Sequence, residues 1–202
     1  EQDSFEINPD AVKKLITKKT KALIINTPSN PTGNVLRKKT LEGLADLAIQ
    51  HDLHIFADEA YEQLTYEKKH ISIASLNGLK NITTFQTFSK SFAMCGFRLG
   101  YACSNASLIK DMTKVHHYIT LSAPHISQAV GIKALTLPKK HINAMVREYK
   151  RRRDMIVRRL NAMNLPCPLP GGAFYTFSNI QAHNKDSLKF SKMLLKKAKV
   201  AV

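Results

Sequence analysis

The chain has 202 residues, of which 44% are hydrophobic, and its 31 basic and 15 acidic side chains give a formal net charge of +16. This length and apolar content suffice to bury a core, which excludes an intrinsically disordered chain. No apolar run reaches the ~18 residues of a membrane span and the first residues lack a signal-peptide pattern, so we expect a cytoplasmic protein without a membrane partner.

The first half of the chain alternates apolar runs with amphipathic stretches. Asn8 is the expected cap of a first helix, with Pro9 in its first turn. Leu41, Leu44 and Leu47 then repeat at helical spacing between two apolar runs, which predicts a right-handed parallel crossover and an α/β fold. The predicted elements are a helix over 8–20, a strand over 22–25, a helix over 38–51, and strands over 53–56 and 82–88.

The second half is mostly helical by its apolar periodicity. Pro166, Pro168 and Pro170 indicate a rigid connection before its one expected strand. We expect a large domain over residues 1–152 and the start of a smaller domain over residues 153–202. The predicted elements are helices over 104–118, 122–137 and 138–164, a strand over 173–177, and a final helix from Ser187.

A polar cluster follows each of the three predicted strands of the first half. Asn30 lies in an Asn-Pro-Thr-Gly turn after the first strand, Asp58 and Tyr61 follow the second, and Lys90 follows the third. In open α/β sheets ligands bind beyond the carboxyl ends of the strands. We therefore expect Asn30, Asp58 and Lys90 to meet in one crevice.

The stretch from Thr87 to Gly100 combines hydroxyls with one lysine and one arginine. A lysine amine with a lowered pKa forms a Schiff base with an aldehyde, which is how proteins attach pyridoxal phosphate. Lys90 is the candidate for this bond. Arg98, with the hydroxyls of Thr87 and Ser89, would hold the phosphate, because a guanidinium binds phosphate through two parallel hydrogen bonds.

The other residues of the crevice have roles that the same cofactor requires. Asp58 would keep the pyridine nitrogen protonated, which makes the ring an electron sink. Tyr61 would donate a hydrogen bond to the phenolic oxygen of the ring, and Asn30 to that oxygen or to a substrate carboxylate. Gly33 permits the tight turn that brings Asn30 in. Lys90, once released by substrate, would act as general acid and base.

With these motifs in their order and spacing, the chain resembles the fold-type I pyridoxal-phosphate aminotransferases of class I and II, in particular the aspartate and aromatic aminotransferase-like group. Residues 169–177 also look like a strand of that family's smaller domain. Thr87 stands where the family usually has serine or glycine, and its hydroxyl still suits a phosphate. The matching motifs are Asn30 in Asn-Pro-Thr-Gly, Asp58 and Tyr61 in Asp-x-x-Tyr, Ser89-Lys90, and Arg98 in Gly-x-Arg-x-Gly.

The resemblance implies a three-layer αβα sandwich with a mainly parallel sheet, joined to part of a smaller α+β domain. It also implies pyridoxal 5'-phosphate as cofactor, a cis Asn30–Pro31 bond in a tight bend, and a homodimer. Family members carry an upstream glycine-containing phosphate loop with a ring-stacking aromatic residue, and a downstream arginine for the substrate carboxylate. No arginine follows Arg159 in this sequence, so we expect an internal fragment of a longer enzyme.

The expected function is transfer of an amino group from an L-amino acid to a 2-oxo acid. A beta-lyase on the same fold is the near alternative, because Asn30, Asp58, Tyr61, Lys90 and Arg98 serve both reactions. A nucleic-acid-binding module is the alternative from another class, since basic residues concentrate in 139–159 and 192–199. No recognition motif accompanies them, and nucleic acid is not an expected partner.

The cysteines and histidines point to no further site. Cys95, Cys103 and Cys167 have no C-x-x-C spacing, which favours reduced thiols. The pairs His51/His54 and His116/His117 lack partners at metal-ligand spacing, so they are expected as loop and helix-surface residues and no metal site is predicted.

Overall fold

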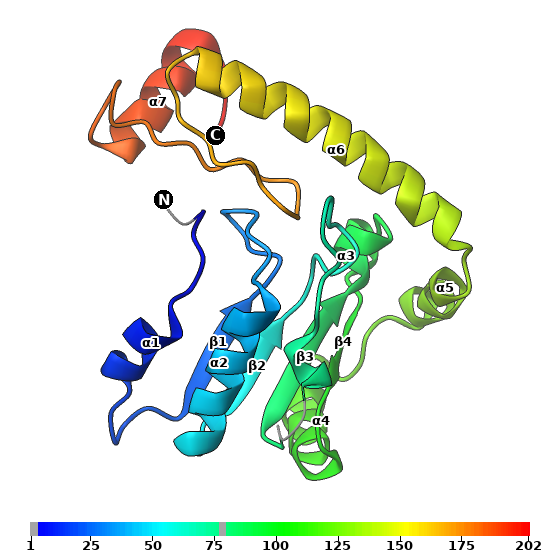
Figure 1. The fold of residues 1–202 in the computed structure, drawn as a ribbon. Helices are drawn as coiled ribbons and strands as arrows, with labels where there is room; N and C mark the ends of the chain where they lie inside the picture. Colours follow the sequence, from blue (N-terminus) through cyan, green and yellow to red (C-terminus); the bar gives the residue numbers. More distant parts are fainter. Residues whose placement is uncertain (1–3, 77–79) are drawn as a thin grey trace.

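The computed structural model describes residues 4–76 and 80–202, and its four strands form one sheet in the order β1-β2-β3-β4 (Figure 1). The first three strands run parallel and β4 is antiparallel to β3. Asn26, at the end of β1, pairs with Asp58, and Asp58 pairs with Phe85, so the carboxyl ends of these strands meet at one edge. The strands are β1 (Ala22–Asn26), β2 (His54–Asp58), β3 (Ile82–Thr87) and β4 (Gly100–Cys103).

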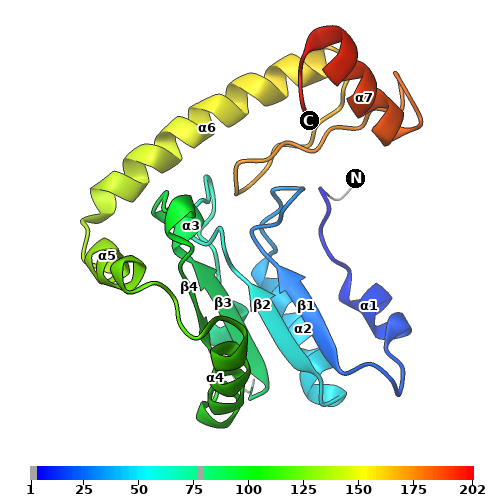
Figure 2. The ribbon, with the colours of Figure 1, turned by 180° about the vertical axis from the view of Figure 1, so that it is seen from behind.

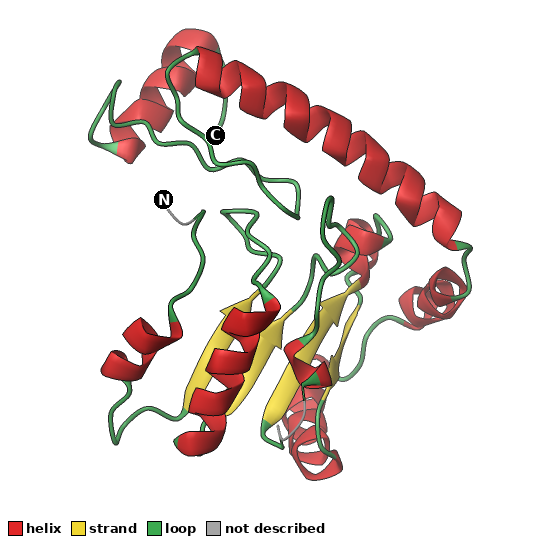
Figure 3. Cartoon of the chain, in the orientation of Figure 1, coloured by secondary structure: helices red, strands yellow, loops and turns green. Residues whose placement is uncertain are grey.

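Helices flank this sheet and extend beyond its carboxyl edge (Figure 3). Helix α2 lies against one face and α4 on the side opposite to it (Figures 1 and 2). The predicted α/β class with a mainly parallel sheet is confirmed. The helices are α1 (Pro9–Leu15), α2 (Lys38–Gln50), α3 (Phe88–Ser91), α4 (Ala106–Thr120), α5 (His125–Leu135), α6 (Lys139–Ala162) and α7 (Ser187–Ala198), with short 3₁₀ turns η1 (Ile73–Ser75) and η2 (Cys95–Phe97).

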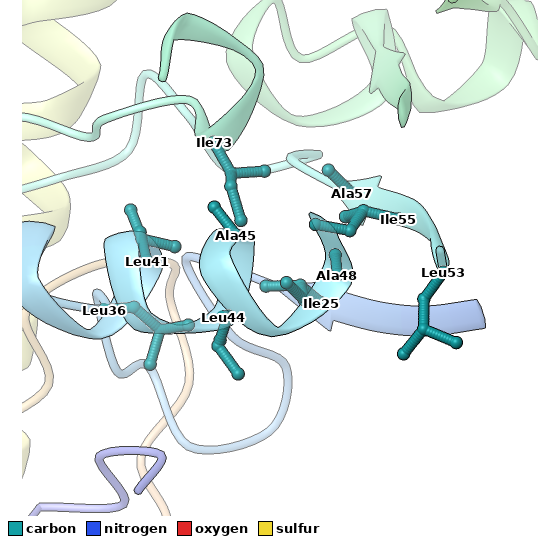
Figure 4. Close-up of a cluster of buried hydrophobic side chains, with 10 residues drawn as sticks. All are labelled: Ile25, Leu36, Leu41, Leu44, Ala45, Ala48, Leu53, Ile55, Ala57 and Ile73. Atoms are coloured by element: carbon teal, nitrogen blue, oxygen red, sulfur yellow. The ribbon is translucent and has the colours of Figure 1, made fainter. Parts of the chain in front are cut away.

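The main core lies between α2 and the first two strands (Figure 4). Leu41, Leu44 and Ala48 fall on one face of α2 because they are spaced three, four and seven residues apart, and they pack against Ile25 and Ile55. Burying one such aliphatic side chain contributes about 1.5–3 kcal/mol. This packing fixes the parallel crossover that the sequence predicts.

The opposite face of β1 is open in the described chain. Side chains alternate along a strand, so Leu23 and Ile25 face α2 while Ile24 faces away. Ile24 is 81% exposed. Its neighbour across the sheet, Phe56, is half-buried. The apolar surface of this face is therefore only partly covered.

The first helix is shorter than expected, ending at Leu15 rather than Thr20. Ile16 is already extended, and a turn follows in which Thr17 donates its backbone N–H to the Thr20 hydroxyl at 3.0 Å. Threonine hydroxyls compete in this way with helical hydrogen bonds. The start is as expected, because the Asn8 side chain accepts from the Asp10 backbone N–H at 2.9 Å.

The expected strand over 173–177 is wrong, because these residues form a loop whose backbone groups bind other loops. Ala173 donates its backbone N–H to the Leu64 carbonyl at 2.8 Å, and its own carbonyl accepts from the Tyr66 hydroxyl. The nearest ladder contact is one isolated bridge between Thr65 and Gly172. Buried backbone groups need hydrogen-bond partners, and those of Ala173 find them in Leu64 and Tyr66 rather than in a partner strand.

Two smaller differences concern the sheet. Strand β4 was not expected, because its four residues come at the end of the proposed phosphate-binding stretch and do not form a clear apolar run. His54, which lies in the predicted strand over 53–56, begins β2 rather than standing in a loop, and its Nε2 lies 2.9 Å from the Thr83 hydroxyl. The three cysteines are free, as expected. Within the described residues no helix is both long and apolar enough to cross a membrane.

Helix α6 arches over the carboxyl ends of the strands, with the loop before α7 running beneath it (Figures 1 and 2). Arg153 ties this helix to the loop after β2. Its side chain is 6% exposed and donates to both carboxylate oxygens of Glu67, at 2.8 and 2.6 Å, and to the Pro170 carbonyl at 2.8 Å. It also pairs with Asp154 at 2.7 Å. One buried cation thus joins three segments.

Candidate active site

The loop after β1 turns sharply and brings Asn30 to the edge of the sheet. Both Thr27–Pro28 and Asn30–Pro31 are cis, which confirms the prediction for the second bond. The Asn30 backbone N–H donates to Asn26 Oδ1 at 2.7 Å. Gly33 has φ +68°, and a Cβ there would lie 2.5 Å from Pro170 Cβ. The turn therefore needs glycine both for its backbone conformation and for its close approach to residue 170.

Asp58 ends β2 at the same edge. Its Oδ1 accepts from the Ala60 backbone N–H at 3.2 Å, and its other carboxylate oxygen accepts no bond from the described residues. The Asn26 side chain donates to the Asp58 carbonyl at 3.2 Å, which ties β1 to β2 here. Tyr61, in the turn that follows, is 4% exposed. One side of the Asp58 carboxylate is thus free to bind a donor.

Lys90 lies in α3, directly after β3. Thr87 caps this short helix, since its hydroxyl oxygen accepts from the Ser89 backbone N–H at 3.1 Å. Lys90 Nζ lies 5.7 Å from the ring centroid of Tyr61 and 5.4 Å from that of Phe174. In the part of the chain that the structure describes, no carboxylate pairs with this amine. The amine faces two aromatic rings.

Hydrogen bonds of Cys95 connect Arg98 to α3. The guanidinium donates to the Cys95 carbonyl at 2.9 Å, and the Cys95 thiol donates to the Ser89 carbonyl at 3.0 Å. Arg98 itself is in the left-handed conformation, with φ 51°. The Thr87 hydroxyl donates to the Leu99 carbonyl at 3.3 Å. The hydroxyl residues and the guanidinium therefore belong to one connected turn.

Tyr175 and Phe174 are part of this site, and sequence reasoning did not assign them there. The Tyr175 hydroxyl oxygen lies 2.6 Å from that of Tyr61 and accepts from the Asn30 side-chain amide at 3.3 Å. Phe174 meets the Tyr61 ring edge-on, with centroids 5.4 Å apart. The available signal was the Gly-Gly-Ala-Phe-Tyr run, which served only as a family motif.

Burial raises the pKa of the Tyr61 phenol above its ordinary value, and the hydrogen bond with Tyr175 raises this pKa further. The nearby Asp58 carboxylate acts in the same direction and the Asn30 amide opposes it. Tyr61 is therefore neutral at physiological pH, with a proton that it can donate.

The donor set fits pyridoxal phosphate. An amine that pairs with no carboxylate among the described residues suits an aldehyde, a carboxylate oxygen with no bond suits a protonated ring nitrogen, and a neutral phenol suits a ring oxygen. The guanidinium of Arg98 and the hydroxyls of Thr87 and Ser89 suit a phosphate. Asn30, Asp58 and Lys90 follow strands that end at one edge of the sheet, as the sequence predicts.

Comparison with known proteins agrees with this geometry. The chain is 46% identical over 206 aligned residues to an aspartate aminotransferase of Pyrococcus abyssi, covering all of this chain and 53% of that protein. It is 43% identical to an aromatic-amino-acid aminotransferase of Thermococcus litoralis, again covering all of this chain and 53% of that protein. The chain spans about half the length of the curated relatives it matches.

Solved structures show the same likeness. A crystal structure of an aromatic aminotransferase from Pyrococcus horikoshii OT3 matches with a TM-score of 0.96 and 44% identity, over all of this chain and 55% of the other. An aspartate aminotransferase from Thermus thermophilus with maleate matches with a TM-score of 0.92 and 38% identity, over all of this chain and 53% of the other. Residues 1–202 match the family of class I and II aminotransferases throughout, and the chain belongs to that family.

Proposed function

We propose that this chain supplies the lysine and the ring-binding residues of an aminotransferase, which transfers an amino group from an L-amino acid to a 2-oxo acid. The observation that carries the proposal is the position of Lys90, whose amine faces Tyr61 and Phe174. Aspartate and aromatic aminotransferases depend on pyridoxal phosphate, and membership of their family supports the same cofactor here.

Pyridoxal phosphate supplies an aldehyde for covalent attachment and a ring that withdraws electrons from the substrate alpha carbon. Lys90 would form the covalent bond and, once displaced, carry a proton to and from that carbon. Asp58 would face the ring nitrogen, and Tyr61 the phenolic oxygen. Asn30 would donate to this oxygen or to the substrate carboxylate.

The phosphate would be bound by the turn around α3. Arg98 supplies a fixed positive charge and Ser89 a hydroxyl donor, while the Thr87 proton, which is donated to the Leu99 carbonyl, would have to turn to the phosphate. Thr87 is already oriented because its oxygen caps α3.

The test is the visible absorbance of the full-length protein after addition of pyridoxal phosphate, followed by borohydride reduction and peptide mass analysis. We expect an absorbance band and a permanent mass increase on the peptide that contains Lys90, both lost in Lys90→Ala. Lys110→Ala is the matched control, because Lys110 is exposed on α4. A mass increase on a different lysine would contradict the proposal.

Product analysis separates the aminotransferase from a beta-lyase on the same scaffold. Amino-group transfer requires a 2-oxo acid acceptor, so product formation should stop when the acceptor is omitted. Release of pyruvate and ammonia from a cysteine derivative without an acceptor would favour the lyase.

We propose that the protein acts as a homodimer in the cytoplasm. Support for the dimer comes from large apolar side chains exposed on and between α4 and α5, of which Tyr118 is 91% exposed. The cytoplasmic location is supported by the three free thiols, which agree with a reducing compartment. Sedimentation velocity of the full-length protein tests the dimer, and a monomeric mass at micromolar concentration would contradict it. The exposed side chains are Val115, Tyr118, Ile119, Leu121, Ile126, Ile132 and Leu135.

We also propose that a large domain ends near residue 152 and that a smaller domain begins at residue 153. This boundary lies within α6, so the helix would be shared by both domains. The buried Arg153 at this point, with bonds to Glu67 and Pro170, supports the assignment of a junction here.

A further inference from the structure

The contact between Tyr61 and Tyr175 joins residues 114 positions apart in the sequence. Their hydroxyl oxygens lie 2.6 Å apart and their rings meet edge-on, with centroids separated by 5.7 Å and an interplanar angle of 79°. This distance lies toward the short end of the range for a hydrogen bond between two hydroxyls. Tyr175 therefore binds the one phenol that we assign to the cofactor ring.

Contacts of the three residues that precede Tyr175 hold this segment in place. Gly172 donates its N–H to the Gly33 carbonyl at 2.9 Å, and Ala173 donates to the Leu64 carbonyl at 2.8 Å. Phe174 stacks on Tyr149 of α6, with centroids 5.3 Å apart. These bonds come from the turns after β1 and β2 and from α6, so the Tyr175 hydroxyl is positioned by the surrounding fold.

Counting donors fixes the direction of one of the two hydrogen bonds of Tyr175, the one from Asn30. The Asn30 amide nitrogen only donates, so the Tyr175 oxygen accepts from it. Tyr175 then has one proton, and within the described residues the only acceptor bonded to its hydroxyl is the Tyr61 oxygen. If Tyr175 donates to Tyr61, the Tyr61 proton remains for a ligand.

A chain of donors that point the same way strengthens each member, because every bond polarises the next. An anionic oxygen placed against Tyr61 would draw the Tyr61 proton and thereby orient the Tyr175 proton toward Tyr61. The resulting order is Asn30 to Tyr175, Tyr175 to Tyr61, and Tyr61 to the ligand.

We propose that Tyr175 is a positioning residue that acts through Tyr61, fixing its phenol and strengthening its hydrogen bond to the phenolic oxygen of the cofactor ring. This inference rests on the proposed cofactor function. It gives a role to a residue from the segment before α7, whereas Asn30, Asp58 and Lys90 follow the carboxyl ends of three strands.

The experiment is a double-mutant cycle on the full-length holoenzyme with Tyr175→Phe, Tyr61→Phe and the double variant. Each change removes a hydroxyl and keeps the ring. The measured quantity is the pH at which the visible absorbance of the bound cofactor changes. We expect Tyr175→Phe to move this midpoint in the same direction as Tyr61→Phe, by about one pH unit or less, which is up to tenfold in the equilibrium.

If Tyr175 acts through Tyr61, its substitution should have no further effect once the Tyr61 hydroxyl is gone. Ser187→Ala is the control, because it removes an exposed hydroxyl at the start of α7, outside the face proposed for the dimer, and it should leave the midpoint unchanged. An unchanged midpoint in Tyr175→Phe would overturn the inference, and so would an equal shift in the presence and absence of the Tyr61 hydroxyl.

A second readout uses the protein without cofactor. Tyr61 ionisation, obtained from ultraviolet absorbance as the difference from Tyr61→Phe, should shift to a different pH in Tyr175→Phe, because the hydrogen bond between the two hydroxyls is lost. If pyridoxal phosphate fails to bind the wild-type protein, the proposed function fails. The tyrosine titration still shows whether Tyr175 acts on Tyr61, and an unchanged Tyr61 titration would contradict the inference.

Discussion

Arg98 combines an unusual backbone conformation with a guanidinium at the edge of the site. Its φ of 51° is in the left-handed region, which costs a non-glycine residue roughly 1–2 kcal/mol. The bond from its side chain to the Cys95 carbonyl offsets part of this cost and holds the guanidinium beside the turn that contains Ser89. A guanidinium held in this position is suited to bind a phosphate.

Replacing Arg98 by alanine should weaken the binding of pyridoxal phosphate to the full-length protein. A charge-assisted hydrogen bond contributes about 1.5–3 kcal/mol, so the Kd should rise roughly 10- to 150-fold. Arg98→Lys should give an intermediate loss, because an ammonium cannot form the bidentate contact.

An absorbance titration measures the effect, with Arg158→Ala as control because Arg158 is exposed on α6. A Kd for Arg98→Ala within twofold of the wild-type value would show that Arg98 does not bind the phosphate.

The sequence predicts the site residues that directly follow strands better than those that loop contacts bring to the site. Asn30, Asp58 and Lys90 meet because parallel strands end at one edge, and this could be read from the apolar runs. Tyr175 could not be found in this way, because its place depends on loop contacts with residues far away in the sequence.

Elements outside the sheet are joined by the buried cation Arg153 and its partner Glu67. The hydrogen bond from Arg153 lowers the pKa of the Glu67 carboxyl to about 2, while its partial burial opposes this shift. The pKa in the folded state is thus below the ordinary value of about 4.3. The pair therefore stabilises the fold above pH ~4.3, and this contribution is lost as the pH falls toward 2.

Glu67→Gln should lower the free energy of unfolding at pH 7 by about 1 kcal/mol, a modest figure because the Glu67 side chain is 46% exposed. The difference from the wild-type protein should shrink between pH ~4.3 and 2. Urea unfolding at several pH values measures it. Asp111→Asn, which breaks the exposed Asp111–Lys114 pair, should have little effect at any pH. A constant difference between wild type and Glu67→Gln down to pH 2 would contradict the assignment.

The ends of a helix were predictable where the spacing of its apolar residues marks them. The spacing of Leu41 and Leu44 gives α2 within one residue at its end. The expected strand over 173–177 rested on the resemblance to the family's smaller domain, and among the described residues one isolated bridge between Thr65 and Gly172 takes the place of a partner strand. The first helix ended early because threonine hydroxyls bind the backbone locally, which apolar spacing does not reveal.

Over the whole molecule, the charge of +16 is carried largely by α6, α7 and their flanks. Part of it is neutralised locally, since Arg151 and Arg152 both contact Glu148, at 2.8 and 2.7 Å. Apart from the buried Arg153, most of the remaining lysines and arginines of these helices are exposed. Such a distribution attracts polyanions without selecting among them.

Any binding of the protein to double-stranded DNA should therefore be weak and disappear between low and physiological salt, because phosphate contacts release counterions. Fluorescence anisotropy with two unrelated DNA sequences measures this. Equal, salt-sensitive affinity for both is the expected outcome. Binding that persists at physiological salt with preference for one sequence would favour the nucleic-acid alternative.

The stacking of Phe174 on Tyr149 makes the site sensitive to the angle of α6. Tyr149 lies about 15 Å along the helix axis from its first residue, so a tilt of about 10° about that end would displace it by about 3 Å. A hydroxyl contact of 2.6 Å does not survive such a displacement. A movement of α6 that displaced Phe174 would therefore also separate the Tyr175 hydroxyl from Tyr61.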